Sequence, residues 1–165
     1  MSLPSLMRLN IFSLECQSYQ NLTDGNRKIT YSAGLVTCDY DVLTPGWYRF
    51  EGAAGTKMAT SCVPTNHCGT HATGWLNGAH PTVAEGQVTR QACFHYFSDC
   101  CEWSINIQVR NCSEYFVYYI NRTPPEHTCH LRYCGADWTK WVNTMRGLFR
   151  NNPTHWELLH ISLRW

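Results

Sequence analysis

The sequence has little charge and no marked excess of either sign. Charged residues make up 15% of the 165 residues, and the formal net charge is +1, whereas an average domain is roughly 25% charged. A nucleic-acid-binding domain usually carries a basic patch or stripe, and none is present here. No apolar run approaches the roughly 18 residues that a membrane-spanning helix needs. The composition therefore argues against both a nucleic-acid-binding domain and a membrane span.

Common motifs of enzymes and zinc modules are also missing. The sequence contains no Gly-rich phosphate loop, no convincing pair of catalytic carboxylates and no Cys-x-x-Cys pair. Two clusters of cysteine and histidine have spacings that match no common zinc module. A nucleophilic thiol would have to be free, and nothing in the sequence marks one of the cysteines as unpaired. We therefore expect no catalytic site, no metal site and no cofactor. A hydrolase or a zinc protein is the least favoured class of function. The two clusters are His67, Cys68 and His71, and His127, Cys129, His130 and Cys134.

What the sequence does contain is cysteine, ten residues in all. An even and large number of cysteines is typical of a disulfide framework in a secreted domain, and metal ligands or free buried thiols are the alternatives. Four of the cysteines lie between Cys93 and Cys112. Cys100 and Cys101 are adjacent and point to opposite sides of an extended chain, so we expect them to tie this segment to two different, distant partners.

The same segment continues into a strand pattern. Residues 103–109 alternate between apolar and polar side chains, which predicts a strand with one buried face. Residues 115–120 are aromatic and β-branched, and we expect them to form a hairpin with 103–109 across residues 111–114. The fold class predicted is mainly β: a small disulfide-rich extracellular domain with a central β-hairpin. The 13% aromatic content suits this prediction.

Two clean sequons for N-glycosylation occur, at Asn21-Leu22-Thr23 and Asn121-Arg122-Thr123. The second follows the predicted strand and precedes Pro124-Pro125, which prevents further regular pairing. We therefore expect Asn121 on an exposed loop. A third match, Asn111-Cys112-Ser113, is less favoured because its cysteine is expected in a disulfide.

The two ends of the chain are less informative. Residues 1–15 have an apolar tendency, but Arg8 and Asn10 interrupt any run of signal-peptide length, so we predict no convincing signal peptide there. Residues 16–134 form the cysteine-rich domain, and 135–165 form a tail without cysteine. The tail is interpreted as a docked amphipathic helix, a membrane-surface segment or an extension without an evolved function. Its helical spacing is set by Trp138, Trp141, Met145 and Leu148, with a capping box at Thr154 and Glu157.

Several uncommon sequence words occur in order and resemble one family. They are GWYRF from Gly46, CVPTNHCGT from Cys62, WLNGAHP from Trp75, EGQVTRQACFHYFSDCCEW from Glu85 and CHLRYC from Cys129. Together they are similar to the cysteine-rich module, with eight or ten cysteines, of uromodulin and the pancreatic zymogen-granule membrane glycoprotein. The growth-factor-like repeats and the polymerisation domain that usually flank this module are not found in this sequence, so filament formation is not implied.

The resemblance implies a secreted, non-enzymatic and mainly β module with five disulfides. The implied pairs are Cys16-Cys112, Cys38-Cys129, Cys62-Cys100, Cys68-Cys134 and Cys93-Cys101. It also implies a mannose-rich N-glycan at Asn121. Bacterial mannose-binding pilus adhesins would bind this glycan, so that the protein acts as a soluble decoy in innate defence. The alternative is a structural or protein-interaction domain that binds an extracellular protein, with glycans at Asn121 and Asn21 that only aid solubility.

Overall fold

The computed structural model describes residues 13–34, 36–123 and 130–137. The helical elements are short: η1 (Leu14–Cys16), η2 (Gly25–Arg27), α2 (Asp39–Val42) and η3 (Gly52–Ala54). Most of the described chain is in strands or in the turns between them, which confirms the mainly β prediction. The strands are β1 (Gln20–Leu22), β2 (Gly46–Phe50), β3 (Lys57–Met58), β4 (Ala72–Asn77), β5 (Gln87–Tyr96), β6 (Asp99–Asn111), β7 (Phe116–Ile120), β8 (Leu131–Tyr133) and β9 (Gly135–Ala136).

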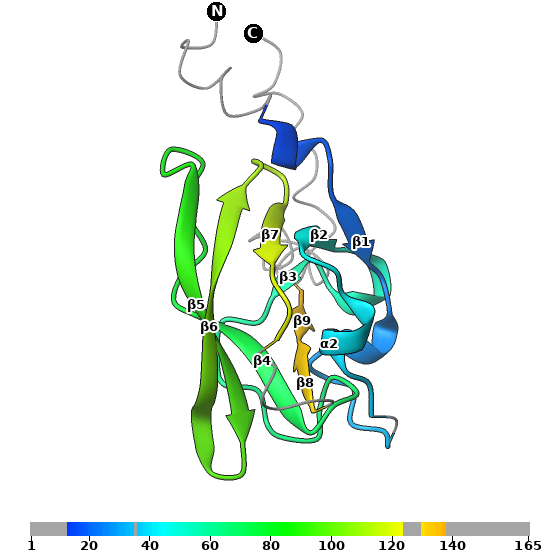
Figure 1. Ribbon diagram of the computed structural model, residues 1–165. Helices are drawn as coiled ribbons and strands as arrows, with labels where there is room; N and C mark the ends of the chain where they lie inside the picture. Colours follow the sequence, from blue (N-terminus) through cyan, green and yellow to red (C-terminus); the bar gives the residue numbers. More distant parts are fainter. Residues whose placement is uncertain (1–12, 35, 124–129, 138–165) are drawn as a thin grey trace, which may run out of the picture.

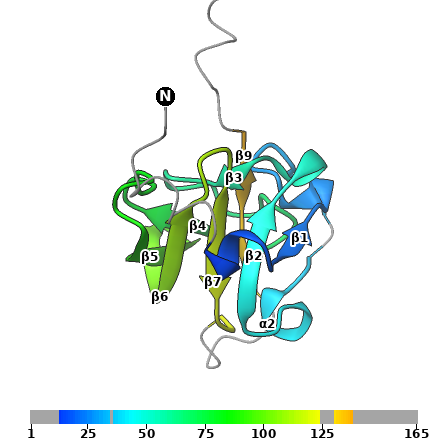
Figure 2. The same ribbon diagram turned by 90° about the horizontal axis from the view of Figure 1, so that it is seen from above.

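Seven of these strands form one sheet in the order β1-β2-β7-β6-β5-β4-β8, and β3 pairs with β9 in a second, two-stranded sheet. Neighbouring strands are antiparallel except at the two edges, where β1 runs parallel to β2 and β8 runs parallel to β4. The β5–β6 hairpin is the longest part of the sheet (Figure 1), and β7, β2 and β1 follow β6 along the sheet (Figure 2). Strand β9 lies just beyond Cys134, the predicted end of the cysteine-rich domain.

Strand β6 has the expected alternation. Ile107 and Val109 are buried, while the polar residues between and before them are exposed or half-buried. It pairs with β7 in the predicted hairpin, whose turn is closed by the Cys112 amide donating to the Tyr115 carbonyl. The strand starts at Asp99, four residues before the start predicted from the alternation, because it also pairs with β5. Residues 99–102 do not alternate between apolar and polar side chains, so the sequence did not predict this end of the strand.

Aromatic side chains fill the core. Phe50 packs on Tyr118 with ring centroids 5.6 Å apart, and Phe94 packs on Tyr133 at 5.2 Å. The chain passes very close to itself at β9, where a Cβ added to Gly135 would lie 1.9 Å from the Ala54 carbonyl oxygen. A glycine is therefore required at residue 135, and any larger residue would separate β9 from η3.

Four disulfide bonds join described residues, and each is one of the five pairs that the family resemblance implies. Three of the four involve the segment between Cys93 and Cys112. The fifth implied pair joins buried Cys38 to Cys129, which lies outside the described residues, and stays a prediction. The bonds are Cys16–Cys112, Cys62–Cys100, Cys68–Cys134 and Cys93–Cys101.

The adjacent cysteines do reach two different partners, but one expectation about them was wrong. Cys100 bonds to Cys62, 38 residues away in sequence. Cys101 bonds to Cys93, only 8 residues away. Because β5 and β6 form a hairpin with an irregular register beyond Phe94, this second bond links neighbouring strands and does not reach a distant segment.

The predicted helix in the tail, from Trp138 onward, lies outside the described residues, as does nearly all of segment 1–15. Among the residues that the structure describes, no helix has the length and apolar character to cross a membrane.

His80 is a half-buried titratable group at the edge of the core. The Tyr118 hydroxyl accepts a hydrogen bond from the Met58 amide at 2.9 Å, so its own proton is available for His80 Nε2 at 2.7 Å. Burial, aided by Lys57, lowers the pKa of His80 from 6.5 to about 3. The imidazole is therefore neutral in the folded protein over the physiological range.

Stability should fall in acid because of His80. Between pH 6.5 and about 3 the unfolded chain binds a proton that the folded chain does not. The free energy of unfolding therefore decreases as pH falls through this window. At about pH 4 the decrease due to His80 is about 3 kcal/mol at most. Urea unfolding of His80→Gln, which keeps an acceptor for Tyr118, should show a weaker pH dependence over this range. Identical pH profiles for the two proteins would contradict this assignment.

Candidate glycan sites

Asn121 lies immediately after β7 on a loop with anchored ends. Ile120 before it is fully buried and Thr123 after it is only 1% exposed, whereas Asn121 and Arg122 are exposed. The structure therefore holds the backbone on both sides of Asn121 while leaving its side chain accessible. This placement agrees with the exposed loop that the sequence predicted.

The loop also contacts α2. The guanidinium carbon of Arg122 lies 5.4 Å from the ring centroid of Tyr40. A cation–π contact at a partly exposed position contributes about 0.5–1 kcal/mol. The position of Asn121 therefore depends in part on how firmly α2 is fixed.

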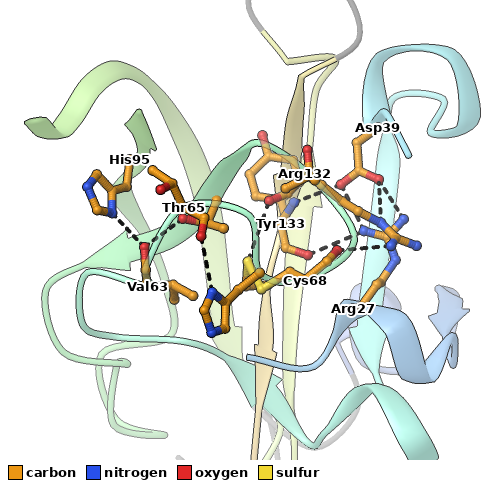
Figure 3. The surroundings of a disulfide bond; sticks show 12 residues. Arg27, Asp39, Val63, Thr65, Cys68, His95, Arg132 and Tyr133 are labelled. Carbon is orange, nitrogen blue, oxygen red and sulfur yellow. Dashed lines mark hydrogen bonds and ion pairs between the residues drawn. A yellow bond between two sulfur atoms is a disulfide. The ribbon is translucent and has the colours of Figure 1, made fainter. Parts of the chain in front are cut away.

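A buried ion pair fixes α2 to the rest of the domain. Asp39, 1% exposed, accepts hydrogen bonds from both Nη atoms of Arg27, at 2.6 and 2.8 Å. The same carboxylate accepts the amide proton of Tyr133 at 2.8 Å, and Arg27 donates to the Tyr133 carbonyl at 3.3 Å. Figure 3 shows these groups converging from η2, α2 and β8.

A second buried arginine extends this cluster. Arg132 Nη1 donates to the Cys68 carbonyl at 3.0 Å, and Arg132 Nε lies 3.8 Å from Asp39 Oδ1. Burial and the neighbouring Arg27 charge lower the pKa of Arg132 to about 10, so it stays protonated at neutral pH. The ion cluster, which we define as Arg27, Asp39 and Arg132, thus lies beside the Cys68–Cys134 disulfide (Figure 3).

The ion cluster was not expected from the sequence. Arg27 follows a turn sequence and Asp39 follows a cysteine, so both would normally be assigned to the surface. One signal was available: Arg132 stands between Leu131 and Tyr133 inside the short word CHLRYC. All three of these residues are buried in β8.

Asn21 is placed differently from Asn121. It is the exposed middle residue of edge strand β1, in register with Arg49 of β2. Asn111, in the third sequon, uses its side chain inside the protein: its amide nitrogen donates to the Pro81 carbonyl, and its oxygen accepts the Ser113 amide proton, both at 2.9 Å. These bonds and the Cys112 disulfide explain why this sequon is a poor candidate.

Cysteine and histidine meet at one place among the described residues. Cys62, His95 and Cys100 lie within metal-ligand distance of one another. The two sulfurs are joined in a disulfide, and His95 Nδ1 is hydrogen-bonded with the Val63 carbonyl at 2.7 Å. Of the two predicted clusters, Cys68 and Cys134 are likewise bonded to each other. Because a thiolate is the form of cysteine that binds zinc, these four cysteines are committed to structure.

Comparison with known proteins identifies the family. The sequence profile of the cysteine-rich uromodulin-like domain matches residues 48–135, more than half of the chain. The chain belongs to the uromodulin-like domain family. Asn121, Arg132 and three of the disulfide bonds lie within the matched region, whereas Asn21 and the other two residues of the ion cluster precede it.

Curated relatives agree with this assignment. The chain is 47% identical to uromodulin of Rattus norvegicus over 119 residues, 45% identical to the pancreatic secretory granule membrane major glycoprotein GP2 of Canis lupus familiaris over 120 residues, and 40% identical to that of Homo sapiens over 120 residues. Each alignment covers 72% of this chain but only 18–23% of the relative. The chain therefore spans about a fifth of these longer proteins.

The uromodulin-like domain buries one member of the Asn121 sequon. The hydroxyl oxygen of Thr123 has no hydrogen-bond partner among the described residues. An unpaired buried hydroxyl is costly, and an apolar side chain of the same shape avoids that cost. The transfer of a glycan needs the threonine hydroxyl, so a glycan on Asn121 would have to be added before this loop docks.

Thr123→Val should remove the sequon without weakening the fold. When both proteins are made without glycan, we expect the variant to be as stable as the parent or up to about 1 kcal/mol more stable. Urea unfolding followed by fluorescence measures this difference. Thr23→Val, at the exposed threonine of the other sequon, is the matched control and should change little. A loss of more than about 1 kcal/mol in Thr123→Val would show that its hydroxyl is paired.

Proposed function

We propose that this uromodulin-like domain is a secreted, non-enzymatic glycoprotein module that presents a mannose-rich N-glycan on Asn121 as a soluble decoy for bacterial pilus lectins. The relatives support the coarser part, since one of them is by name a secretory granule membrane glycoprotein. The disulfides support an oxidising compartment. The finer part rests on Asn121 and its surroundings.

The observation that carries the proposal is the support beneath Asn121. Ile120 and Thr123 are buried on either side of the exposed Asn121–Arg122 pair, and Arg122 contacts Tyr40 of the anchored α2. When a lectin binds a glycan, the contacts must offset the conformational entropy that the glycan loses. A glycan on a fixed loop loses less than a glycan on a mobile one. The mannose-rich state is the part of the proposal that requires processing mannosidases to be excluded from this glycan.

Lectin capture should depend on Asn121 and not on Asn21. We expect the protein, expressed in a secretory mammalian host, to bind an immobilised mannose-specific pilus lectin domain in biolayer interferometry. Asn121→Gln should weaken binding at least about tenfold, or about 1.4 kcal/mol, because the presented sugar is lost. Treatment with α-mannosidase should have the same effect on the unmodified protein.

The matched control is Asn21→Gln, which removes the other sequon and should leave lectin binding within about twofold, a difference well under about 1 kcal/mol. Glycopeptide mass spectrometry of the same samples reports the glycan at each site. Complex-type sugar at Asn121, or lectin binding that survives both Asn121→Gln and mannosidase, would contradict the proposal.

One observation favours the alternative, a protein-interaction domain. Phe97 at the tip of the β5–β6 hairpin is 79% exposed and adopts a φ of 48°, a backbone conformation uncommon for a large side chain. Tyr96 contacts it at 4.2 Å between ring centroids and stacks on Trp103 at 5.1 Å. An aromatic side chain presented in this way is typical of a protein contact, and binding that is independent of glycan but lost in Phe97→Ser would support this alternative.

A further inference from the structure

Two tyrosines and an arginine form a cluster on the outer face of the sheet, close to Asn21. The Arg49 guanidinium lies 4.1 Å from the ring centroid of Tyr115 and donates from Nη1 to the Tyr19 hydroxyl at 3.0 Å. The two tyrosine rings are 5.5 Å apart. We call Tyr19, Arg49 and Tyr115 the tyrosine platform.

The platform is held in place from several directions. The Tyr115 hydroxyl donates to the carbonyl of Cys16, a residue fixed by its disulfide to Cys112. Arg49 Nη2 pairs with Glu51 at 3.3 Å. The rings are therefore fixed before any ligand arrives, so a ligand that packs on them would cost little additional side-chain entropy.

The side chain of Asn21 lies on the same face of the sheet as this platform. Residues in register on neighbouring strands project to the same face, and Asn21 is in register with Arg49. Residues two apart in an extended chain also share a face, and the hydroxyl of Tyr19 is bonded to Arg49. Tyr19 is thus on the same side as Asn21 and is partly exposed, while the Asn21 side chain is exposed beside it.

The first sugar of an N-glycan is N-acetylglucosamine, joined directly to the asparagine amide. One face of its pyranose ring presents C–H groups, which pack well against an aromatic ring in the way that other apolar groups do. A sugar attached at Asn21 has a very high effective concentration near Tyr19, so a contact too weak to bind free sugar is populated when the sugar is tethered.

We propose that the tyrosine platform is a packing site for the first N-acetylglucosamine of a glycan on Asn21, with Tyr19 as the principal contact. This contact stabilises β1, a strand of three residues that pairs only with β2 among the described strands and leaves one edge open. The Asn21 glycan is thereby a structural part of the domain, distinct from a glycan presented for capture at Asn121.

A thermodynamic cycle between the glycan and Tyr19 tests this proposal. All proteins carry Asn121→Gln and are expressed in a secretory host with mannosidases inhibited, so that the result is independent of the function proposed for Asn121. Thermal unfolding compares the parent with Tyr19→Leu, Asn21→Gln and the double variant. We expect Tyr19→Leu to lower Tm by about 2–5 °C more when the glycan is present than when it is absent.

Three further samples sharpen the test. Endoglycosidase H trimming to a single N-acetylglucosamine should keep Tm within about 1 °C of the untrimmed protein, since only the first sugar touches the platform. Thr23→Ala removes the glycan but keeps Asn21 and should match Asn21→Gln. Tyr40→Leu, a partly exposed tyrosine on α2, is the matched control and should cost the same with and without the Asn21 glycan.

The proposal is overturned if Tyr19→Leu lowers Tm equally in the glycosylated and unglycosylated proteins, because Tyr19 would then have only a structural role. It is also overturned if intact mass shows no glycan on Asn21. If Tyr19→Leu does not fold, Tyr19→His in its place provides a smaller ring in the same position, and a glycan-dependent loss of Tm is again required.

Discussion

The buried ion pair between the Asp39 carboxylate and Arg27 is the interaction on which most of this structure depends. The carboxylate neutralises Arg27, accepts the Tyr133 amide proton and lies 3.8 Å from Arg132. A buried charge is expensive unless it is paired and fully hydrogen-bonded. Loss of this one carboxylate would leave two buried arginines with only the exposed carboxylate of Asp24 as counter-charge, 3.4 Å from Arg132 and 3.9 Å from Arg27. The cluster therefore specifies one arrangement of η2, α2 and β8, in which Arg27 and Asp39 are 12 residues apart in sequence and Tyr133 lies 94 residues beyond Asp39.

The ion cluster positions two other parts of the domain. Through α2 it positions Tyr40, on which Arg122 packs beside Asn121. Through β8 it positions Cys134, whose disulfide to Cys68 closes the loop before β4. The β5–β6–β7 strands are held separately by three other disulfides and an aromatic core. The domain is thus stabilised by buried ion pairs at the β8 edge of the sheet and by disulfide bonds at the central strands.

The sequence predicted those features that depend on local pattern. The β6–β7 hairpin followed from alternation and aromatic content, and the exposure of Asn121 from the strand end and the two prolines. The disulfide pairs came from family resemblance, since spacing alone could not select them, and Cys38–Cys129 remains a prediction. The ion cluster, the burial of Thr123 and the parallel edge strands depend on contacts between residues far apart in sequence or on the final packing, and no local pattern encodes such contacts.

The most direct test of this account is the free energy of unfolding of Asp39→Asn, measured by urea denaturation at neutral pH. Asp41→Asn, an exposed aspartate in the same helix, is the control. Removing one partner of a buried ion pair usually costs about 3–5 kcal/mol, whereas an exposed aspartate contributes under about 1 kcal/mol. A loss of about 3 kcal/mol or more for Asp39→Asn, with little change for Asp41→Asn, is the predicted result. Equal and small losses for the two variants would show that the ion cluster is not what the fold depends on.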